Sequence, residues 1–143
     1  MSNNYMLALD LGESSGSNKN AINIAEKLAK NDGATLHVVT IIPNFSMPIV
    51  GSYFPEGFEE KHFAHAKEEL KKQIFEDAQD PESIVRHVVQ GSIYQEIIRS
   101  ADRLDCSLII IEAHRPDLKD YLLGPNAARV VRHAKQSVYV IRS

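Results

Sequence analysis

Residues 108–132 read LIIIEAHRPDLKDYLLGPNAARVVR, and this stretch decides the fold. Its opening run, Leu108–Ile111, is apolar without alternation and mostly β-branched, which is typical of a parallel strand buried on both faces. A polar loop follows, and Gly124-Pro125 marks the start of a helix. A strand, a loop and a helix N-terminus in this order favour an anion, because free backbone amides point outward at the helix start. We therefore predict a phosphate site between Glu112 and Asn126.

The rest of the chain alternates between short apolar runs and amphipathic stretches. The apolar runs predict further strands at residues 5–10, 35–42, 83–89 and 137–142. The amphipathic stretches predict helices at residues 18–31, 58–78 and 92–104, and a last helix from residue 125 onward. In the third of these helices, Ser92 and Gln95 have the spacing of a capping box.

Strands that alternate with helices predict an α/β fold: a doubly wound parallel sheet with helices on both faces, built as one domain over residues 1–143. Ligands of such sheets bind beyond the carboxyl ends of the strands, at the switch point. If the first and fourth strands are neighbours there, Asp10, the end of the second strand and Glu112 converge on one cleft. The long segment Pro43–Gly57, with three prolines and two glycines, predicts a lid or a contact for a protein partner.

Composition excludes several classes of function. The net charge of −3 gives no basic footprint for nucleic acid. The first residues lack the apolar core of a secretion signal, and no apolar run approaches the roughly 18 residues of a membrane span. These features predict a cytoplasmic protein without a membrane or nucleic-acid partner. Cys106 is the single cysteine, and we interpret it as a buried, inert thiol.

Familiar catalytic and metal motifs are absent from the sequence. There is neither a GxGxxG fingerprint nor a GxxxxGK[ST] phosphate loop. The hydroxyls and histidines are scattered without a nucleophile elbow, so we predict no catalytic residues. His62 and His65 lie three residues apart on a charged helix, and a solvated helix face explains them better than a metal site. Asp10 is either a turn-capping acid or a ligand contact.

Three features of the chain together carry a family resemblance. They are the apolar strand that ends in Asp10, the strand and turn Thr35–Pro43, and the block IIIEAHRPDLKDYLLGPNAARVVRHAKQSVYVIR at residues 109–142. Over nearly its whole length the chain resembles the universal stress proteins, a family of small α/β nucleotide-binding proteins. The C-terminal block is most similar to a bacterial subgroup with a His-Arg-Pro-Asp loop and a Leu-Leu-Gly-x-Asn helix start.

The resemblance implies a five-stranded parallel sheet in the order 3-2-1-4-5 and a homodimer that pairs through the C-terminal strand, residues 137–142. It also implies a stress-response regulator that binds an adenine nucleotide, ATP above all, with or without Mg²⁺. Hydrolysis should be slow at most, because the sequence shows no general base or metal cluster near the phosphates. In ATP-binding members the equivalents of Asp10 and of the backbone near Thr40 contact the nucleoside. The implied site residues are Ala8, Asp10, Thr40, Ile111, Glu112, His114, Arg115, Gly124, Pro125 and Asn126.

The chain departs from the phosphate pattern of ATP-binding members, G-x2-G-x9-G-[ST]. Glu112 and Arg115 stand where the first two glycines would be, and the spacing from Arg115 to Gly124 is one residue short. Pro125 replaces the Ser or Thr and thereby removes a hydroxyl and an N–H. Loss of these groups lowers the free energy of nucleotide binding by about 1–3 kcal/mol, or the affinity by about tenfold to a hundredfold. The alternative reading is therefore a dimeric interaction module with a vestigial cleft, whose partner contacts residues 43–57.

Overall fold

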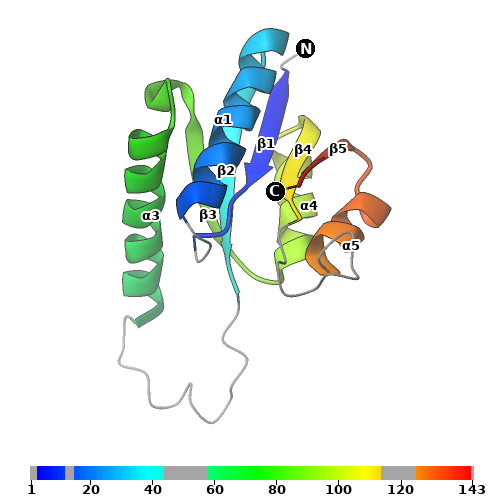
Figure 1. Ribbon diagram of the computed structural model, residues 1–143. Coiled ribbons are helices and arrows are strands. Elements are labelled where there is room, and N and C mark those ends of the chain that lie inside the picture. Colours follow the sequence, from blue (N-terminus) through cyan, green and yellow to red (C-terminus); the bar gives the residue numbers. More distant parts are fainter. Residues whose placement is uncertain (1–2, 12–14, 44–57, 114–124, 143) are drawn as a thin grey trace.

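The computed structural model describes residues 3–11, 15–43, 58–113 and 125–142 (Figure 1). Within these residues, five parallel strands form one sheet in the order β3-β2-β1-β4-β5, which confirms the expected strand order and fold class. The strands are β1 (Asn4–Ala8), β2 (Thr35–Ile42), β3 (Val85–Gln90), β4 (Cys106–Glu112) and β5 (Ser137–Ile141). The helices are α1 (Ser15–Asp32), α3 (Phe58–Asp77), α4 (Ile93–Arg103) and α5 (Pro125–His133), with a 3-10 turn, η1, at Pro81–Ser83.

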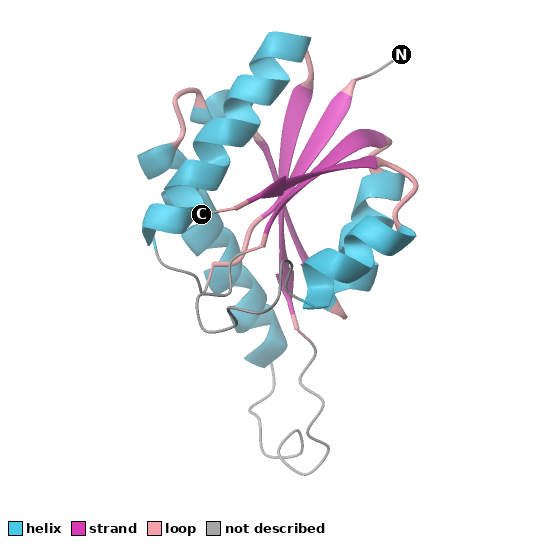
Figure 2. Ribbon diagram, turned by 45° about the vertical axis from the view of Figure 1, so that its right-hand side comes forward, coloured by secondary structure: helices cyan, strands magenta, loops and turns pink. Residues whose placement is uncertain are grey.

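The sheet lies between two helical layers. Helices α1 and α3 cover one face, and α4 and α5 cover the other (Figure 2). The apolar run of β4 serves both layers: Ile110 joins the core under α1 and α3, whereas Ile109 and Ile111 join the core under α4 and α5. Burial of each isoleucine side chain stabilises the folded state by about 1.5–3 kcal/mol. Burial on both faces explains why this strand lacks polar alternation.

Several element ends differ from those that the sequence predicts. Strand β1 stops at Ala8, two residues before Asp10, although the Leu9 N–H still donates to the Val39 carbonyl at 2.9 Å. Strand β3 begins at Val85, because the 3-10 turn takes up Pro81–Ser83. The pattern of apolar residues predicted that both strands exist. Where each strand ends depends on its backbone hydrogen bonds.

The predicted capping box at the start of α4 is wrong. Ser92 occupies the cap position, but its side chain donates to or accepts from no described backbone group there. Instead, Glu96 folds against Gly91, so that a Cβ on Gly91 would lie 2.6 Å from the Cγ of Glu96. A carboxylate in the first helical turn complements the helix dipole. Glu96, rather than Gln95, is thus the acidic side chain that lies beside Gly91, and its carboxylate also accepts from Arg99 at 2.9 Å.

Candidate functional site

The chain that follows β1 is fixed by side chains from two other elements. The Thr40 hydroxyl of β2 donates to the Leu9 carbonyl at 2.8 Å, and the Asn18 amide of α1 donates to the Asp10 carbonyl at 2.9 Å. Thr40 is 3% exposed and Asn18 is 1% exposed. A buried polar group that loses its hydrogen bond costs about 1–3 kcal/mol, so these contacts hold the turn in one conformation. The backbone of Asp10 is consequently held at a defined point beyond the carboxyl end of β1, and its side chain is exposed there.

Strand β1 lies between β2 and β4, where the direction of strand succession reverses. Leu7 pairs with Ile110 of β4, and Ala8 pairs with Val39 of β2. Strand β4 ends two residues past Ile110, and β2 runs on to Ile42, three residues past Val39. The neighbouring positions of β1 and β4 confirm the condition for a shared cleft. This switch point is the usual ligand site of a doubly wound sheet.

The other residues predicted for the site fall into three groups. Ala8 and Glu112 are half-buried at the ends of β1 and β4, whereas the Ile111 side chain is 3% exposed and packs in the core under α4 and α5. Pro125 is the first residue of α5, as predicted, and Asn126 follows it, half-buried. Outside the described residues lie His114, Arg115 and Gly124, together with the segment 44–57.

The side chain of Thr40 has a role that the sequence analysis did not predict. The resemblance implies that the backbone near Thr40 meets the nucleoside, and this stays a prediction. The Thr40 hydroxyl donates to the Leu9 carbonyl, so the side chain supports the chain that follows β1. Asn18, which the sequence analysis did not single out, does the same for Asp10. The available signal was an asparagine in the first turns of a helix that follows a Gly- and Ser-rich loop.

A second arrangement that the sequence analysis missed joins two neighbouring strands. His37 of β2 and His87 of β3 approach to 2.9 Å between Nδ1 and Nε2. Burial lowers the pKa of both rings, and for His87 the nearby His37 and Arg103 lower the pKa further. Both residues lie in the amino-terminal halves of their strands, away from Asp10.

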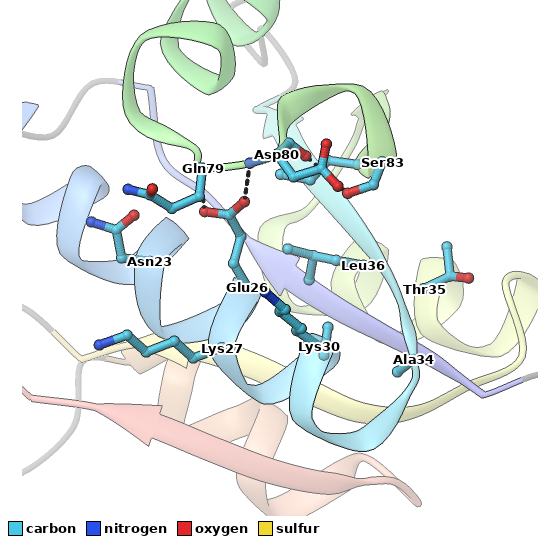
Figure 3. A pocket seen from close by; sticks show the side chains of 12 residues that line it. Asn23, Glu26, Lys27, Lys30, Ala34, Thr35, Leu36, Gln79, Asp80 and Ser83 are labelled. Atoms are coloured by element: carbon cyan, nitrogen blue, oxygen red, sulfur yellow. Dashed lines mark hydrogen bonds between the residues drawn. The ribbon is translucent and has the colours of Figure 1, made fainter.

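A pocket of about 670 Å³ opens at the amino ends of β2 and β3, opposite to the predicted cleft (Figure 3). Glu26 of α1 reaches across it and accepts hydrogen bonds from the backbone N–H groups of Gln79 and Asp80, both at 2.9 Å. The lining residues are Asn23, Glu26, Lys27, Ala29, Lys30, Ala34, Thr35, Leu36, Gln79, Asp80, Ser83 and Ile84. The carboxylate of Glu26 is thereby engaged in holding the turn between α3 and β3.

Among the described residues, no group of three or more His, Cys, Asp or Glu side chains is arranged to hold a metal ion. None of the described helices has the length and apolar character that crossing a membrane requires.

Comparisons with known proteins agree with this fold over the whole chain. The model of the universal stress protein family matches residues 1–142. The universal stress protein G of Shigella flexneri is 32% identical over 140 residues, which cover 96% of each chain, and that of Salmonella typhimurium matches at the same identity and coverage.

Solved structures extend the match. The universal stress protein UspA of Lactobacillus plantarum superposes with a TM-score of 0.75 at 21% identity, over 98% of this chain and 97% of that one. A universal stress protein in complex with cAMP superposes with a TM-score of 0.60 at 20% identity, over 99% and 97%. The family match, the relatives and the strand order agree: the chain belongs to the universal stress protein family.

Proposed function

We propose that this protein is a stress-response regulator that binds an adenine nucleotide, ATP in preference, at the carboxyl ends of β1, β2 and β4. The observation that carries the proposal is the fixed turn at Leu9 and Asp10, which Thr40 and Asn18 hold from behind. A turn whose carbonyls are held by buried hydrogen bonds needs no further ordering of its backbone on binding. The cytoplasmic location predicted from the sequence belongs to the same proposal.

The chemistry of Asp10 suits the nucleoside part of the ligand. A carboxylate accepts hydrogen bonds from ribose hydroxyls or from the amino group of adenine. The relative that was solved with cAMP shares this fold, and cAMP contains the same adenosine unit as ATP. The start of α5 supports the phosphate half of the proposal, because Asn126 and Ala127 follow Pro125 in the first turn, where the helix dipole favours an anion.

The test is calorimetric titration of the full chain with ATP, ADP and AMP, with mass spectrometry of small molecules released when the purified protein is denatured. We expect a stoichiometric adenine nucleotide or a measurable heat of binding. Asp10→Ala should weaken binding about tenfold to a hundredfold, because a hydrogen bond to a charged acceptor contributes about 1.5–3 kcal/mol.

Glu82→Gln is the matched control, since Glu82 is an exposed carboxylate in the 3-10 turn at the other end of the sheet. Its affinity should equal that of the unmodified chain. An Asp10→Ala variant that binds ATP as well as the Glu82→Gln variant would remove Asp10 from the site.

The interaction module with a vestigial cleft remains the competing function, and Pro125 favours it. Proline begins α5 without a backbone N–H to offer a phosphate. The variant Pro125→Ser separates the two readings in the same titration. Tighter ATP binding identifies an attenuated nucleotide site, whereas a variant that, like the unmodified chain, binds none of the three nucleotides supports the interaction module.

The proposal also includes a homodimer that pairs through β5. This strand is an edge of the described sheet, and its Tyr139 is 41% exposed. Val131, on the neighbouring helix α5, is 44% exposed. An unpaired strand edge beside exposed apolar side chains is the surface that a second copy of the chain can cover.

A further inference from the structure

Two histidines form a pair on the face of the sheet that α4 covers. His37 and His87 occupy neighbouring strands, and their ring centroids lie 5.2 Å apart with the planes inclined by 25°. Nδ1 of His37 and Nε2 of His87 are 2.9 Å apart. Both side chains are half-buried, and β3 is an edge strand of the described sheet, so the pair keeps access to water.

Asn4 fixes which nitrogen of His37 carries the proton. The Asn4 amide nitrogen donates to the Leu104 carbonyl at 3.1 Å, which turns the amide oxygen toward Nε2 of His37 at 3.3 Å. An amide oxygen only accepts, so Nε2 of His37 is the donor and Nδ1 holds a lone pair. His87 therefore donates from Nε2 to that lone pair. The result is a nitrogen ligand whose tautomer is set by a residue behind it, as in metal sites.

The separation of the two nitrogens matches one coordination geometry better than another. Two imidazole nitrogens bound at about 2.05 Å lie about 2.9 Å apart when they subtend a right angle at the metal, and about 3.3 Å apart at a tetrahedral angle. The observed 2.9 Å is the length of the hydrogen bond between the two rings, and it equals the spacing that a right angle at a metal requires. Tetragonal sites of this kind are typical of Cu²⁺ and Ni²⁺, and Cu²⁺ binds nitrogen ligands most strongly among the divalent ions of the series.

We propose that His37 and His87 form a two-nitrogen site for a divalent transition-metal ion, Cu²⁺ before Ni²⁺, with water completing the coordination. The ion takes the place of the proton between the rings. The proton on Nε2 of His87 leaves for solvent, and Nδ1 of the same ring takes one up, so that both ligands stay neutral. Each lone pair turns by about 45° from the line that joins the nitrogens, a change that terminal histidine torsions allow.

One nearby charge limits the affinity. Arg103, at the end of α4, acts on His87 as a positive charge and opposes a cation there. Its guanidinium bonds to the Ser100 hydroxyl at 3.5 Å, and no ion pair involving Arg103 is among those seen in the described residues. Removing the charge of Arg103 should therefore strengthen metal binding, which a purely structural histidine pair would not show.

The experiment is titration of the full chain with Cu²⁺ alone. Calorimetry measures the affinity and stoichiometry, and electron paramagnetic resonance reports the ligands of the bound ion. We expect one ion per chain at this site, with hyperfine structure from two imidazole nitrogens. Asn4→Ala should weaken binding about tenfold, as is usual for a residue that orients a ligand, and His87→Gln should weaken it further and remove the two-nitrogen signal. Arg103→Gln should tighten binding.

The histidine pair on α3 provides the matched control. His62 and His65 lie one helical turn apart, so the double variant His62→Gln/His65→Gln removes a competing site but leaves β2 and β3 intact. Its Cu²⁺ affinity and spectrum should be those of the unmodified chain. A two-nitrogen signal that survives His87→Gln, or that disappears in the α3 double variant, would place the ion elsewhere and overturn the proposal. Because His87 lies on an edge strand of the described sheet, the His87→Gln variant should fold, and circular dichroism verifies this.

Discussion

A single buried hydroxyl, that of Thr40, connects the end of β2 to the carbonyl of Leu9. Together with Asn18 it sets the backbone position of Asp10, an acid that both the sequence and the strand order place at the switch point. The sequence predicts Asp10, because an acid at the end of an apolar run is visible as a pattern. It does not predict the supporting pair, because Asn18 and Thr40 are distant in sequence and become partners of the same turn only in the folded chain.

Cys106 gives a prediction about chemical reactivity. Its thiol is buried, as the sequence suggested, and burial, followed by the charge of Asp105, raises its pKa to about 11. Because the thiolate is the reactive form, a rise of about two pKa units lowers the thiolate fraction at pH 8 about a hundredfold. We expect alkylation of the native protein by iodoacetamide to be at least that much slower than alkylation in denaturant, as followed by mass spectrometry.

The neighbouring position on β4 supplies the control for this measurement. Ser107 is exposed on the same strand, one residue further along. In the double variant Cys106→Ala/Ser107→Cys, the thiol should react within a few-fold of its rate in denaturant. Rapid alkylation of native Cys106 would contradict the burial that raises its pKa.

Gly91 gives a prediction about the link between β3 and α4. Its φ is +150°, and a Cβ would lie 2.6 Å from Cγ and 2.9 Å from Oε1 of Glu96. Its N–H donates to the Ile42 carbonyl at 3.0 Å, which continues the pairing of β2 with β3. We expect Gly91→Ala to lower the free energy of unfolding by about 1–3 kcal/mol in chemical denaturation, from backbone strain plus the contact with Glu96.

The variant Gly33→Ala separates the cost of backbone strain from the cost of the contact with Glu96. Gly33 has a φ of +66° and no atom within 4 Å of an added Cβ, so Gly33→Ala measures backbone strain without a contact. That change should cost about 1–2 kcal/mol, the penalty of a left-handed residue. In the double variant Gly91→Ala/Glu96→Ala, the contact is relieved and the strain remains, so part of the stability should return. Complete recovery would show that the backbone of Gly91 is unstrained.

The predicted elements agree with the observed ones in their interiors and differ at their ends. The apolar run Leu108–Ile111 predicted a strand buried on two faces, and it is one. The capping box at Ser92 was wrong, because residue spacing cannot show that Glu96 takes the place beside Gly91. Long periodic segments are thus predictable, whereas element ends depend on contacts that only the folded chain makes.

For the molecule as a whole, β5 predicts an oligomeric state. Tyr139 is exposed beside an unpaired strand edge, so Tyr139→Lys should place a charge in the proposed dimer interface. We expect sedimentation velocity to show a dimer for the unmodified chain and mainly monomer for this variant.

Phe75 is the matched control at the opposite edge. It is 46% exposed on α3, with the guanidinium of Arg86 5.7 Å from its ring centre. Phe75→Lys adds the same charge to an exposed apolar position and should leave the dimer intact. A shift to monomer in the Phe75 variant alone would move the interface to β3.

The sequence predicted the whole sheet better than it predicted the sites. Strand order followed from a family resemblance that spans nearly the full chain, and the structure agrees. Neither the His37–His87 pair nor the pocket beside Glu26 could be foreseen, since each joins residues that lie about fifty positions apart in the chain. Register between neighbouring strands creates such pairs, and a single sequence does not contain that register.

The central place of β1 also has a consequence for synthesis on the ribosome. Strand β1 emerges before both of its neighbours, and β2 can pair with it early, yet its other neighbour, β4, ends only at Glu112. Until then, one edge of β1, with the apolar residues Met6 and Leu7, lacks its second partner strand. A nascent chain therefore carries an open strand edge until β4 has been synthesised, which makes it a natural client of ribosome-associated chaperones.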